Sequence, residues 1–388
     1  MEINIKLHKL MLIGVSYLTI AMLGAYATVY QYTILSFTQL FKFNSVMMGV
    51  LICIQYFGMA IPPLFLGVLS AKIGKKKVLL LSYILLILGT LLVGVSASFV
   101  FFMGAVFIIG AGFSVTEATF SAVLMDEFEG QSTRHLNFSQ VAFSVGALAG
   151  PVIAQALINA GIYFKNIYLY YSAVFFSLAV VFLFTKHHND KPVHIDAGSG
   201  NPFIMIFKNK FFVMLGISVF LYVGIENTFA NFADSYFELY LGKPELSAYA
   251  LALFWGAMIP SRFIAGALKL NTEKMFSLCA VIIFTSSIAA MIIPNLILKT
   301  AMFALCGFGC GPLFALLLDS SAKVYNGSRG FCMNIMLSFL SLGGAVWPLL
   351  SGVFVNATAQ IAAYIVCAAT VLIMAYVYLK TIRAAKFN

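Results

Sequence analysis

The chain has 388 residues, of which 62% are hydrophobic and only 9% are charged, and its mean hydropathy is +0.99. Soluble domains carry about 25% charged residues, so this chain lacks the polar side chains that would cover a soluble fold of its length. A net charge of +10 would favour nucleic acid as the partner of a soluble protein. Here the positive charges lie in the loops between apolar segments, where membrane topology explains them, and we expect no nucleic-acid partner.

Twelve apolar segments are long enough to cross a bilayer as helices, which takes about 20 residues each. In the first half they cover residues 10–37, 46–70, 78–97, 99–125, 137–160 and 166–185. In the second half they cover residues 211–237, 246–268, 275–293, 297–320, 330–355 and 359–380. We therefore predict a six-helix bundle over residues 1–185, a cytoplasmic linker over residues 186–210 and a second six-helix bundle over residues 211–388.

The distribution of Lys and Arg sets the expected orientation in the membrane. With the N-terminus inside, 19 of the 23 Lys and Arg residues lie on the cytoplasmic side. The four on the other side are Lys42, Lys165, Lys243 and Lys299. Because cytoplasmic loops carry an excess of positive charge, both termini are predicted to be cytoplasmic. We expect a multi-pass protein of the plasma (cell) membrane, a monomer with the lipid bilayer as its surroundings.

The two halves of the sequence match each other at an offset of 197 residues. Gly110 and Gly112 fall on Gly307 and Gly309. The further matches are Gly130 with Gly327, Asn137 with Asn334, Ser144 with Ser341, Gly146 with Gly343 and Pro151 with Pro348. Single glycine matches arise by chance in membrane helices, but a Pro, an Asn and several Gly in one register indicate a duplication. Six spans per half make the repeats parallel, and such a fold binds its substrate between the halves near the midplane.

The segment after the second span, "GVLSAKIGKKK" at residues 67–77, resembles the signature Gly-x-Leu-Ala-Asp-Arg-x-Gly-Arg-Lys of the major facilitator superfamily. Ala71 stands in place of the acid of that signature. The resemblance implies an all-α membrane protein with twelve transmembrane helices in two parallel six-helix halves, and a loop that locks the cytoplasmic side. Glycine also permits a tight turn, and lysines anchor such a loop at anionic headgroups. The predicted gating residues are Gly67, Lys72, Gly74, Lys75 and Arg262.

Three shorter segments resemble the fucose permease branch of this superfamily, which contains sugar:proton symporters. They are "GAGFSVTEATFSA" in span four, "LYVGIENTFANFADSY" in span seven and "GAMIPSRFIAGAL" in span eight. The resemblance implies symport of a sugar with a proton. The fucose permease itself also carries an acid in span one, where this sequence has no acid and offers Tyr26, Tyr30, Gln31 and Tyr32 instead. Its two-carboxylate relay therefore does not carry over intact.

Two carboxylates, Glu117 and Glu226, lie deep inside predicted spans. A charged group there costs about 2.5–3.5 kcal/mol, so intramembrane acids are candidates for function. We expect both to take part in proton coupling and substrate binding. The alternative is a neutral acid that only hydrogen-bonds between helices. Arg262 lies toward the inner end of span eight, where a headgroup or helix-end contact is expected.

A sugar needs many hydrogen-bond partners and flat faces on which to stack. The predicted substrate-binding residues are Tyr26, Tyr30, Gln31, Gln55, Glu117, Gln140, Glu226, Asn227, Asn231, Trp255 and Asn334. Each aromatic residue or amide taken singly is equally explained by helix packing. Cys306 and Cys310 are one helical turn apart, but no His or further Cys accompanies them, so no metal and no cofactor are expected.

A second function remains open on sequence grounds, a drug or metabolite:proton antiporter of the same fold. "GALAGPVI" at residues 146–153 partly matches the Gly-x-x-x-Gly-Pro element of exporters, without its closing pair of glycines. Gly-x-x-x-Gly also packs helices in many membrane proteins. The amides in the spans favour a small polar solute, most simply a monosaccharide. A receptor of the same fold would be expected to carry a large soluble domain, and the sequence shows no catalytic motif of an enzyme.

Overall fold

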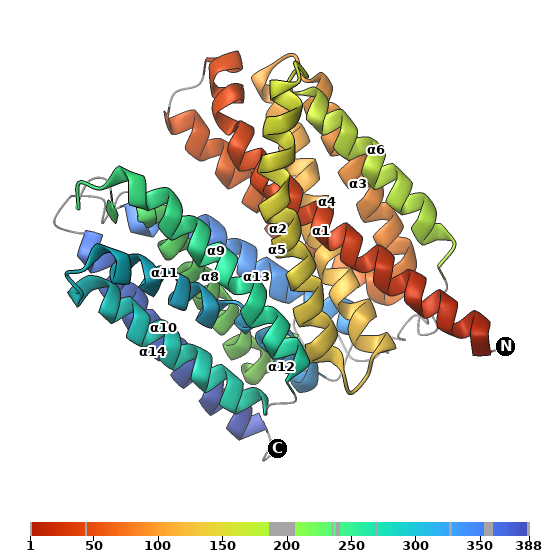
Figure 1. Ribbon diagram of the computed structural model, residues 1–388. Coiled ribbons are helices and arrows are strands. Elements are labelled where there is room, and N and C mark those ends of the chain that lie inside the picture. The colour runs from red at the N-terminus through yellow and green to blue at the C-terminus, as the bar shows by residue number, and fades with distance from the viewer. Residues whose placement is uncertain are drawn as a thin grey trace. The chain divides into compact units, whose positions relative to one another are not determined.

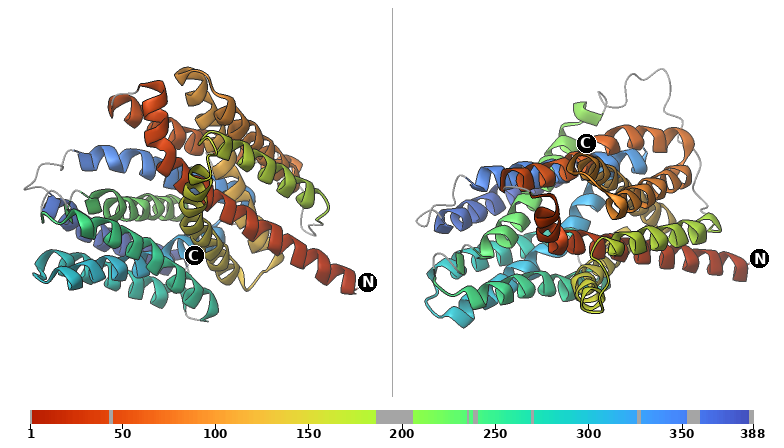
Figure 2. Two further views of the ribbon diagram at one scale, coloured as in Figure 1. Left: turned by 45° about the horizontal axis from the view of Figure 1, so that its top comes forward. Right: turned by 90° about the horizontal axis from the view of Figure 1, so that it is seen from above.

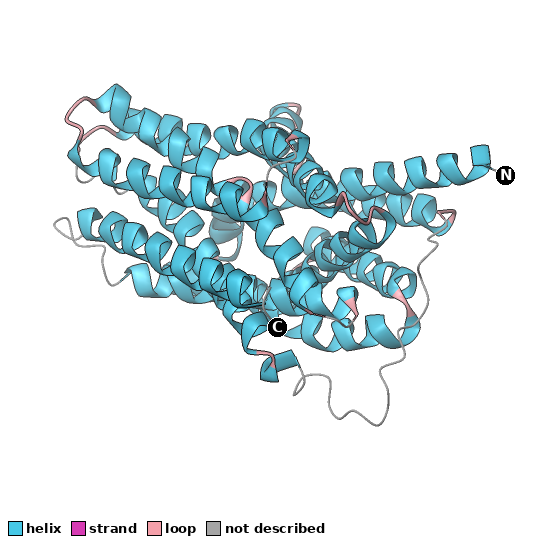
Figure 3. Ribbon diagram, turned by 90° about the horizontal axis from the view of Figure 1, so that it is seen from below, coloured by secondary structure: helices cyan, strands magenta, loops and turns pink. Residues whose placement is uncertain are grey.

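The computed structural model describes residues 2–42, 45–185, 206–234, 236–237, 241–268, 271–325, 328–352 and 360–385. These residues are helical apart from short turns (Figures 1 and 3). In the first half the helices are α1 (Glu2–Phe41), α2 (Ser45–Ile73), α3 (Lys75–Val95), α4 (Phe99–Glu127), α5 (Ser132–Asn159) and α6 (Asn166–Leu183). In the second half they are α8 (Lys210–Asp234), α9 (Pro244–Ala267), α10 (Thr272–Ile292), α11 (Leu296–Cys310), α12 (Leu313–Val324), α13 (Arg329–Gly352) and α14 (Gln360–Ala385).

The predicted all-α membrane fold is confirmed. Twelve helical segments of the described chain are long and apolar enough to cross a membrane, and they correspond one to one with the predicted spans. The tenth of them, Leu296–Val324, consists of α11 and α12 with a break at Gly311 and Pro312 between them. Of the predicted linker, residues 186–205 lie outside the described residues.

The chain divides into two compact units. Unit 1 comprises Met1–Ser199 and Gly327–Ser338, so it holds α1 to α6 and the first part of α13. Unit 2 comprises Gly200–Asn326 and Phe339–Asn388 and holds the other helices. The domain boundaries expected from the sequence, at residues 185 and 211, stay a prediction.

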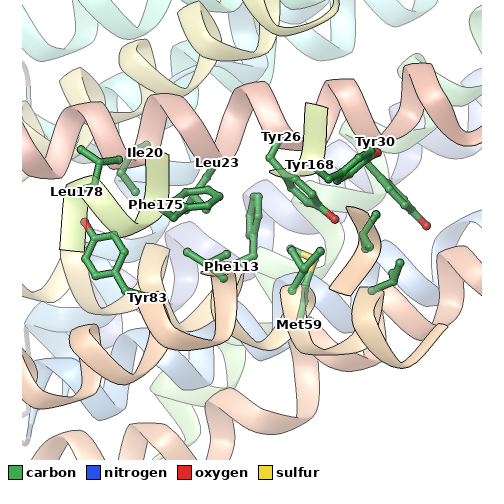
Figure 4. Packing of buried hydrophobic residues seen from close by; sticks show 14 of the residues in the cluster. Ile20, Leu23, Tyr26, Tyr30, Met59, Tyr83, Phe113, Tyr168, Phe175 and Leu178 are labelled. Atoms are coloured by element: carbon green, nitrogen blue, oxygen red, sulfur yellow. The ribbon is translucent and has the colours of Figure 1, made fainter. Parts of the chain in front are cut away.

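Unit 1 is built by helices that pack in pairs (Figures 1 and 2). α1 packs along α5, α4 packs against both α2 and α3, and α3 packs against α6. Large buried side chains fill the space between these helices, among them Tyr26, Tyr83, Phe113, Tyr168 and Phe175 (Figure 4). In unit 2, α11 packs against α9 and α10, and α14 packs against α8 and α10.

The glycines that match between the halves make matching contacts inside each unit. Gly110 of α4 faces the backbone of α2 at Gln55, and Gly307 of α11 faces the backbone of α9 at Phe254. At either glycine a Cβ would overlap with the facing carbonyl oxygen. Gly112 and Gly309 likewise face the carbonyl oxygens of Ser82 and Cys279, which are separated by the same offset of 197 residues. The glycines are therefore places where two backbones approach closely.

Of the two glycines predicted to shape the turn between α2 and α3, only Gly74 lies in it. Gly74 has a φ of +92°, a conformation that favours glycine, and α3 begins directly after it. Gly67 instead lies inside α2, where a Cβ would come within 2.8 Å of the Cβ of Asn334. Its role is close helix packing within unit 1 and not the turn.

Candidate functional site

The first carboxylate lies in the interior of unit 1. Glu117 of α4 is 6% exposed and Gln140 of α5 is 5% exposed. The Gln140 side-chain amide donates a hydrogen bond to Oε1 of Glu117, with Nε2 and Oε1 3.1 Å apart. An amide carries both donors and an acceptor, so it can pair with a carboxylate in its ionised or its protonated form. Both residues were predicted as site residues, and the structure brings them together.

A group of buried aromatic side chains in unit 1 includes Phe113, Tyr26 and Tyr30 (Figure 4). Phe113 is one helical turn from Glu117, and its ring centroid is 6.5 Å from that of Tyr26 on α1. Tyr26 stacks on Tyr30 with 6.1 Å between centroids. Both tyrosines are buried, and neither hydroxyl has a hydrogen-bond partner in the described part of the chain. Because buried polar groups are nearly always hydrogen-bonded, these hydroxyls indicate a place for water or a bound ligand.

The second carboxylate lies in unit 2 and has different neighbours. Glu226 of α8 is partly exposed and accepts a hydrogen bond from the hydroxyl of Tyr222, one turn earlier, at 3.2 Å. Asn227 is partly exposed, and its Nδ2 atom has no partner within the described chain. Asn231 belongs to α8, but its side chain lies outside what the structure describes.

The remaining predicted substrate-binding residues differ in their surroundings. Gln31 and Trp255 are exposed and Gln55 is half-buried. Asn334 is fully buried in unit 1, where its amide donates to the carbonyl oxygen of Gly330 at 2.8 Å and its Oδ1 has no partner among the residues that the structure describes. Their part in binding stays a prediction.

The predicted gating loop is held by an ion cluster in unit 1 that joins α3, α4 and the start of α13. Lys75 is buried and its Nζ is 2.7 Å from Oδ2 of Asp126, while Lys72 is exposed. Arg329, at the start of α13, donates to Oδ1 of the same Asp126 at 3.0 Å and to Glu129 at 2.9 Å. Lys75 is thus paired inside the protein, which corrects the expectation that the lysines of this loop lie at headgroups.

Arg262 makes one of the two contacts expected for it. It is 4% exposed, and its Nε donates to the carbonyl oxygen of Gly311, the C-terminal cap of α11, at 3.0 Å. The expected helix-end contact is therefore confirmed, whereas the headgroup alternative is wrong, because α9 continues to Ala267 and carries Arg262 inside unit 2. The sequence analysis also missed Tyr222, Asp126 and Arg329 as polar partners. For Tyr222 the spacing of four residues from Glu226 was a usable signal, whereas Asp126 and Arg329 are 203 residues apart and no local pattern links them.

Comparison with known proteins decides the family. A sequence model of the Major Facilitator Superfamily matches residues 11–327. The chain belongs to this superfamily. No curated protein matches it in sequence.

Solved structures of this superfamily have the same fold. The fucose:proton symporter FucP of E. coli has a TM-score of 0.78 at 18% identity, over 94% of this chain and 97% of that one. The human organic anion transporter MFSD10 has a TM-score of 0.75 at 15% identity, over 95% of this chain and 99% of that one. The proton:xylose symporter XylE has a TM-score of 0.74 at 14% identity, over 96% of this chain and 95% of that one. The major facilitator protein described here is a multi-pass membrane transporter.

Proposed function

We propose that this transporter moves a small polar solute, a monosaccharide or related sugar, together with a proton. The observation that carries the proposal is the hydrogen bond between Glu117 and Gln140, two buried polar side chains that face each other inside unit 1. Intramembrane acids are costly and are kept where they bind substrate or relay protons. Among proteins of the same fold, FucP is a fucose:proton symporter and XylE is a proton:xylose symporter.

Glu117 supplies the proton site in this proposal. A carboxyl group that exchanges its proton as the protein opens to one side and then to the other can couple two fluxes. Because the Gln140 amide can rotate to offer a donor or an acceptor, it can follow that change without losing its hydrogen bond. A sugar hydroxyl near Glu117 that binds better to one form of the carboxyl group then links sugar binding to proton binding. Glu226 is the second proton-coupling candidate predicted from the sequence.

Tyr26 and Tyr30 supply sugar contacts in this proposal. Their buried hydroxyls have no hydrogen-bond partner among the described residues, their rings stack on each other, and Phe113 of α4 lies against the ring of Tyr26. Sugars present both hydroxyl groups and flat apolar faces, so a tyrosine can hydrogen-bond a sugar through its hydroxyl or stack on it through its ring. A sugar that bonds these hydroxyls also offsets the cost of leaving them unpaired. We further propose a location in the cell membrane with both termini cytoplasmic, and a monomeric protein.

The proposal is tested with the purified protein in proteoliposomes. Uptake of labelled L-fucose, D-xylose and other monosaccharides is measured with and without an inward-directed pH gradient. We expect at least one sugar to accumulate only when the gradient is present. Expulsion of a lipophilic dye in place of sugar uptake would favour the antiporter and overturn the proposal.

A further inference from the structure

The chain contains two tryptophans, and one of them is held in place by contacts inside unit 2. Trp347 of α13 is partly exposed, and its indole Nε1 donates a hydrogen bond to the hydroxyl oxygen of Thr228 on α8 at 2.7 Å. A Cβ at Gly224 of α8 would overlap with the indole ring, so the ring lies directly against that helix. Phe220 packs edge-on against it, with 6.3 Å between ring centroids. The indole therefore has a defined orientation, and part of its surface is accessible.

The corresponding position in the other half of the chain is a glycine. At the repeat offset of 197 residues, Trp347 falls on Gly150 of α5. In unit 1, Gly150 lies against the backbone of α1 at Ala25, and the hydroxyl of Thr28 is 3.0 Å from the position that a Cβ of Gly150 would take. A threonine of the facing helix is thus present in both units. Because unit 1 packs these helices without a side chain at Gly150, helix packing alone does not require the indole of Trp347.

The register between α8 and α13 places Asn227 beside the indole. Gly343 of α13 packs against Val223 of α8, and one turn later Trp347 bonds Thr228, so the two helices run in the same direction at this contact. Asn227 is one turn after Val223, just as Trp347 is one turn after Gly343, so these two side chains are neighbours. Asn227 is partly exposed, and its Nδ2 has no hydrogen-bond partner among the described residues. A buried donor of this kind indicates a place for a group that accepts a hydrogen bond.

An indole face beside an amide donor suits a sugar better than it suits lipid. A pyranose ring presents a face of C–H groups, which can stack on an aromatic ring, and hydroxyl oxygens, which accept hydrogen bonds. A tryptophan at the bilayer interface also has an accessible ring, with its polar N–H toward water. The N–H of Trp347 is instead bonded to Thr228 inside the protein. An amide donor without a partner, such as that of Asn227, would also be costly against lipid.

We propose that Trp347 is the stacking residue of a sugar-binding subsite in unit 2, with Asn227 as the hydrogen-bond donor beside it and Thr228 as the positioning residue that holds the indole. This inference rests on the proposed function and specifies its substrate as a pyranose that is recognised by its apolar face. Acyclic polyols carry similar hydroxyl groups without a flat C–H face, so the subsite rejects them. Because Thr228 orients the indole before the sugar arrives, less freedom is lost on binding.

The subsite is tested by tryptophan fluorescence of the purified full-length protein. In Trp255→Phe the tryptophan emission comes from Trp347, and in Trp347→Phe it comes from Trp255. L-Fucose and D-xylose are titrated into both proteins, with D-mannitol as the acyclic control. We expect at least one of the two sugars to change the emission of Trp347 saturably and to protect it from quenching by acrylamide, whereas D-mannitol should do neither. A response confined to Trp255, or silence of Trp347 in a Trp255→Phe protein that still transports sugar, would overturn the subsite.

The contribution of the ring is measured by sugar counterflow in proteoliposomes. Trp347→Leu keeps an apolar side chain without a flat face and should raise the KM by about tenfold, whereas Trp347→Phe keeps a ring and should raise it by about threefold or less. Thr228→Val keeps the side-chain shape but removes the acceptor of the indole N–H. It should raise the KM by about threefold at an unchanged maximal rate, and it should make Trp347 more accessible to acrylamide. Phe176→Leu, at an aromatic residue of α6 that is 60% exposed, is the control and should keep the wild-type KM.

The outcomes separate this inference from the proposed function. An unchanged KM in Trp347→Leu would overturn the stacking role even if sugar is transported. If wild type transports no monosaccharide, the proposed function fails, and the fluorescence titration still decides the inference. A saturable response of Trp347 would then keep the subsite as a place where sugar binds, and the absence of any response would overturn the subsite as well.

Discussion

The deep carboxylates of the two units stand in unlike surroundings. In unit 1, Glu117 meets the neutral amide of Gln140 at 3.1 Å. In unit 2, Glu226 accepts a hydrogen bond from the Tyr222 hydroxyl on its own helix at 3.2 Å. The amide on a neighbouring helix offers separate donor and acceptor atoms, whereas the tyrosine hydroxyl is one donor that can also accept, so the two acids have different hydrogen-bond partners. Two acids in one transporter can therefore serve two purposes.

The helix packing of the two units is far more alike than the placement of their acids. The glycine contacts of α4 on α2 and α3 reappear as those of α11 on α9 and α10. At the repeat offset, however, Glu117 corresponds to Phe314 and Glu226 corresponds to Val29. Duplication has kept the backbone approaches, while each acid occurs in one half only. The close helix packing is thus shared by the two halves, whereas the buried acids are not.

The largest expected effect is the loss of sugar accumulation when Glu117 of unit 1 is replaced. Glu117→Gln removes the proposed proton site while keeping a polar side chain of similar shape beside Gln140. A pH gradient of one unit is worth about 1.4 kcal/mol, which sustains at most about tenfold accumulation per proton. With the membrane potential clamped, we expect the variant to reach equal concentrations on both sides of the liposome membrane. Sugar counterflow, which needs no net proton movement, should persist.

The matched control for this variant is Glu129→Gln, an acid of unit 1 whose side chain is 80% exposed. It should accumulate sugar as wild type does. If Glu117→Gln loses counterflow together with accumulation, the residue serves binding or folding. Undiminished accumulation would remove Glu117 from the coupling mechanism.

A second expected effect is a loss of stability when Asp126, an acid that joins helices, is replaced. Asp126 is 12% exposed and bonds both Lys75 and Arg329. Asp126→Asn leaves the buried Lys75 ammonium without its counter-charge, which should cost about 3–5 kcal/mol of unfolding free energy. Thermal unfolding of the purified protein measures the loss. Glu129→Gln, which removes an exposed partner of Arg329, should cost at most about 1 kcal/mol. Equal losses in the two variants would contradict a buried structural role for Asp126.

A third effect tests the likeness of the two units. Gly110→Ala and Gly307→Ala each place a methyl group against a facing backbone carbonyl, so each should cost about 1–3 kcal/mol through overpacking. Gly104 of α4 and Gly256 of α9 have nothing within 4 Å of a built Cβ, and their Ala variants should be neutral or slightly stabilising. Melting temperatures of the four variants provide the measurement. A large loss at Gly110 with none at Gly307 would show that the repeat contacts are not equivalent.

Local patterns in the sequence were sufficient to predict the fold. Hydrophobic runs marked the twelve spans, and the superfamily signature pointed to the turn at Gly74, because length, hydropathy and glycine conformations are read over a few residues. The same patterns predicted one uninterrupted tenth span, although Gly311 and Pro312 stand in its middle. A Pro inside a membrane helix can bend it or break it, and the outcome depends on neighbours such as Arg262.

The candidate site could be predicted only as a list of residue types. Glu117 and Gln140 were both on that list, but their pairing depends on how α4 and α5 are turned toward each other. Lys75 was expected at headgroups because its partner Asp126 lies on another helix, and the acceptor of Arg262, the carbonyl oxygen of Gly311, likewise lies on a distant part of the chain. Contacts between residues far apart in sequence leave no periodic signal in a single chain.

The smallest expected effect concerns the tyrosines of unit 1. Tyr30→Phe and Tyr26→Phe remove hydroxyls that have no partner in the described chain, so neither should destabilise the protein, and a slight gain is expected. Tyr168→Phe removes a hydroxyl that hydrogen-bonds Thr33 at 2.6 Å, and it should cost about 1 kcal/mol of unfolding free energy.

For transport, the larger effects are expected from Tyr26→Phe and Tyr30→Phe and the smaller from Tyr168→Phe. Losing a sugar contact at Tyr26 or Tyr30 should raise the KM several-fold, whereas Tyr168→Phe should leave it unchanged. A KM that stays constant in Tyr26→Phe and Tyr30→Phe would assign their hydroxyls to buried water, and the sugar site would then have to be sought on the Glu117–Gln140 face alone.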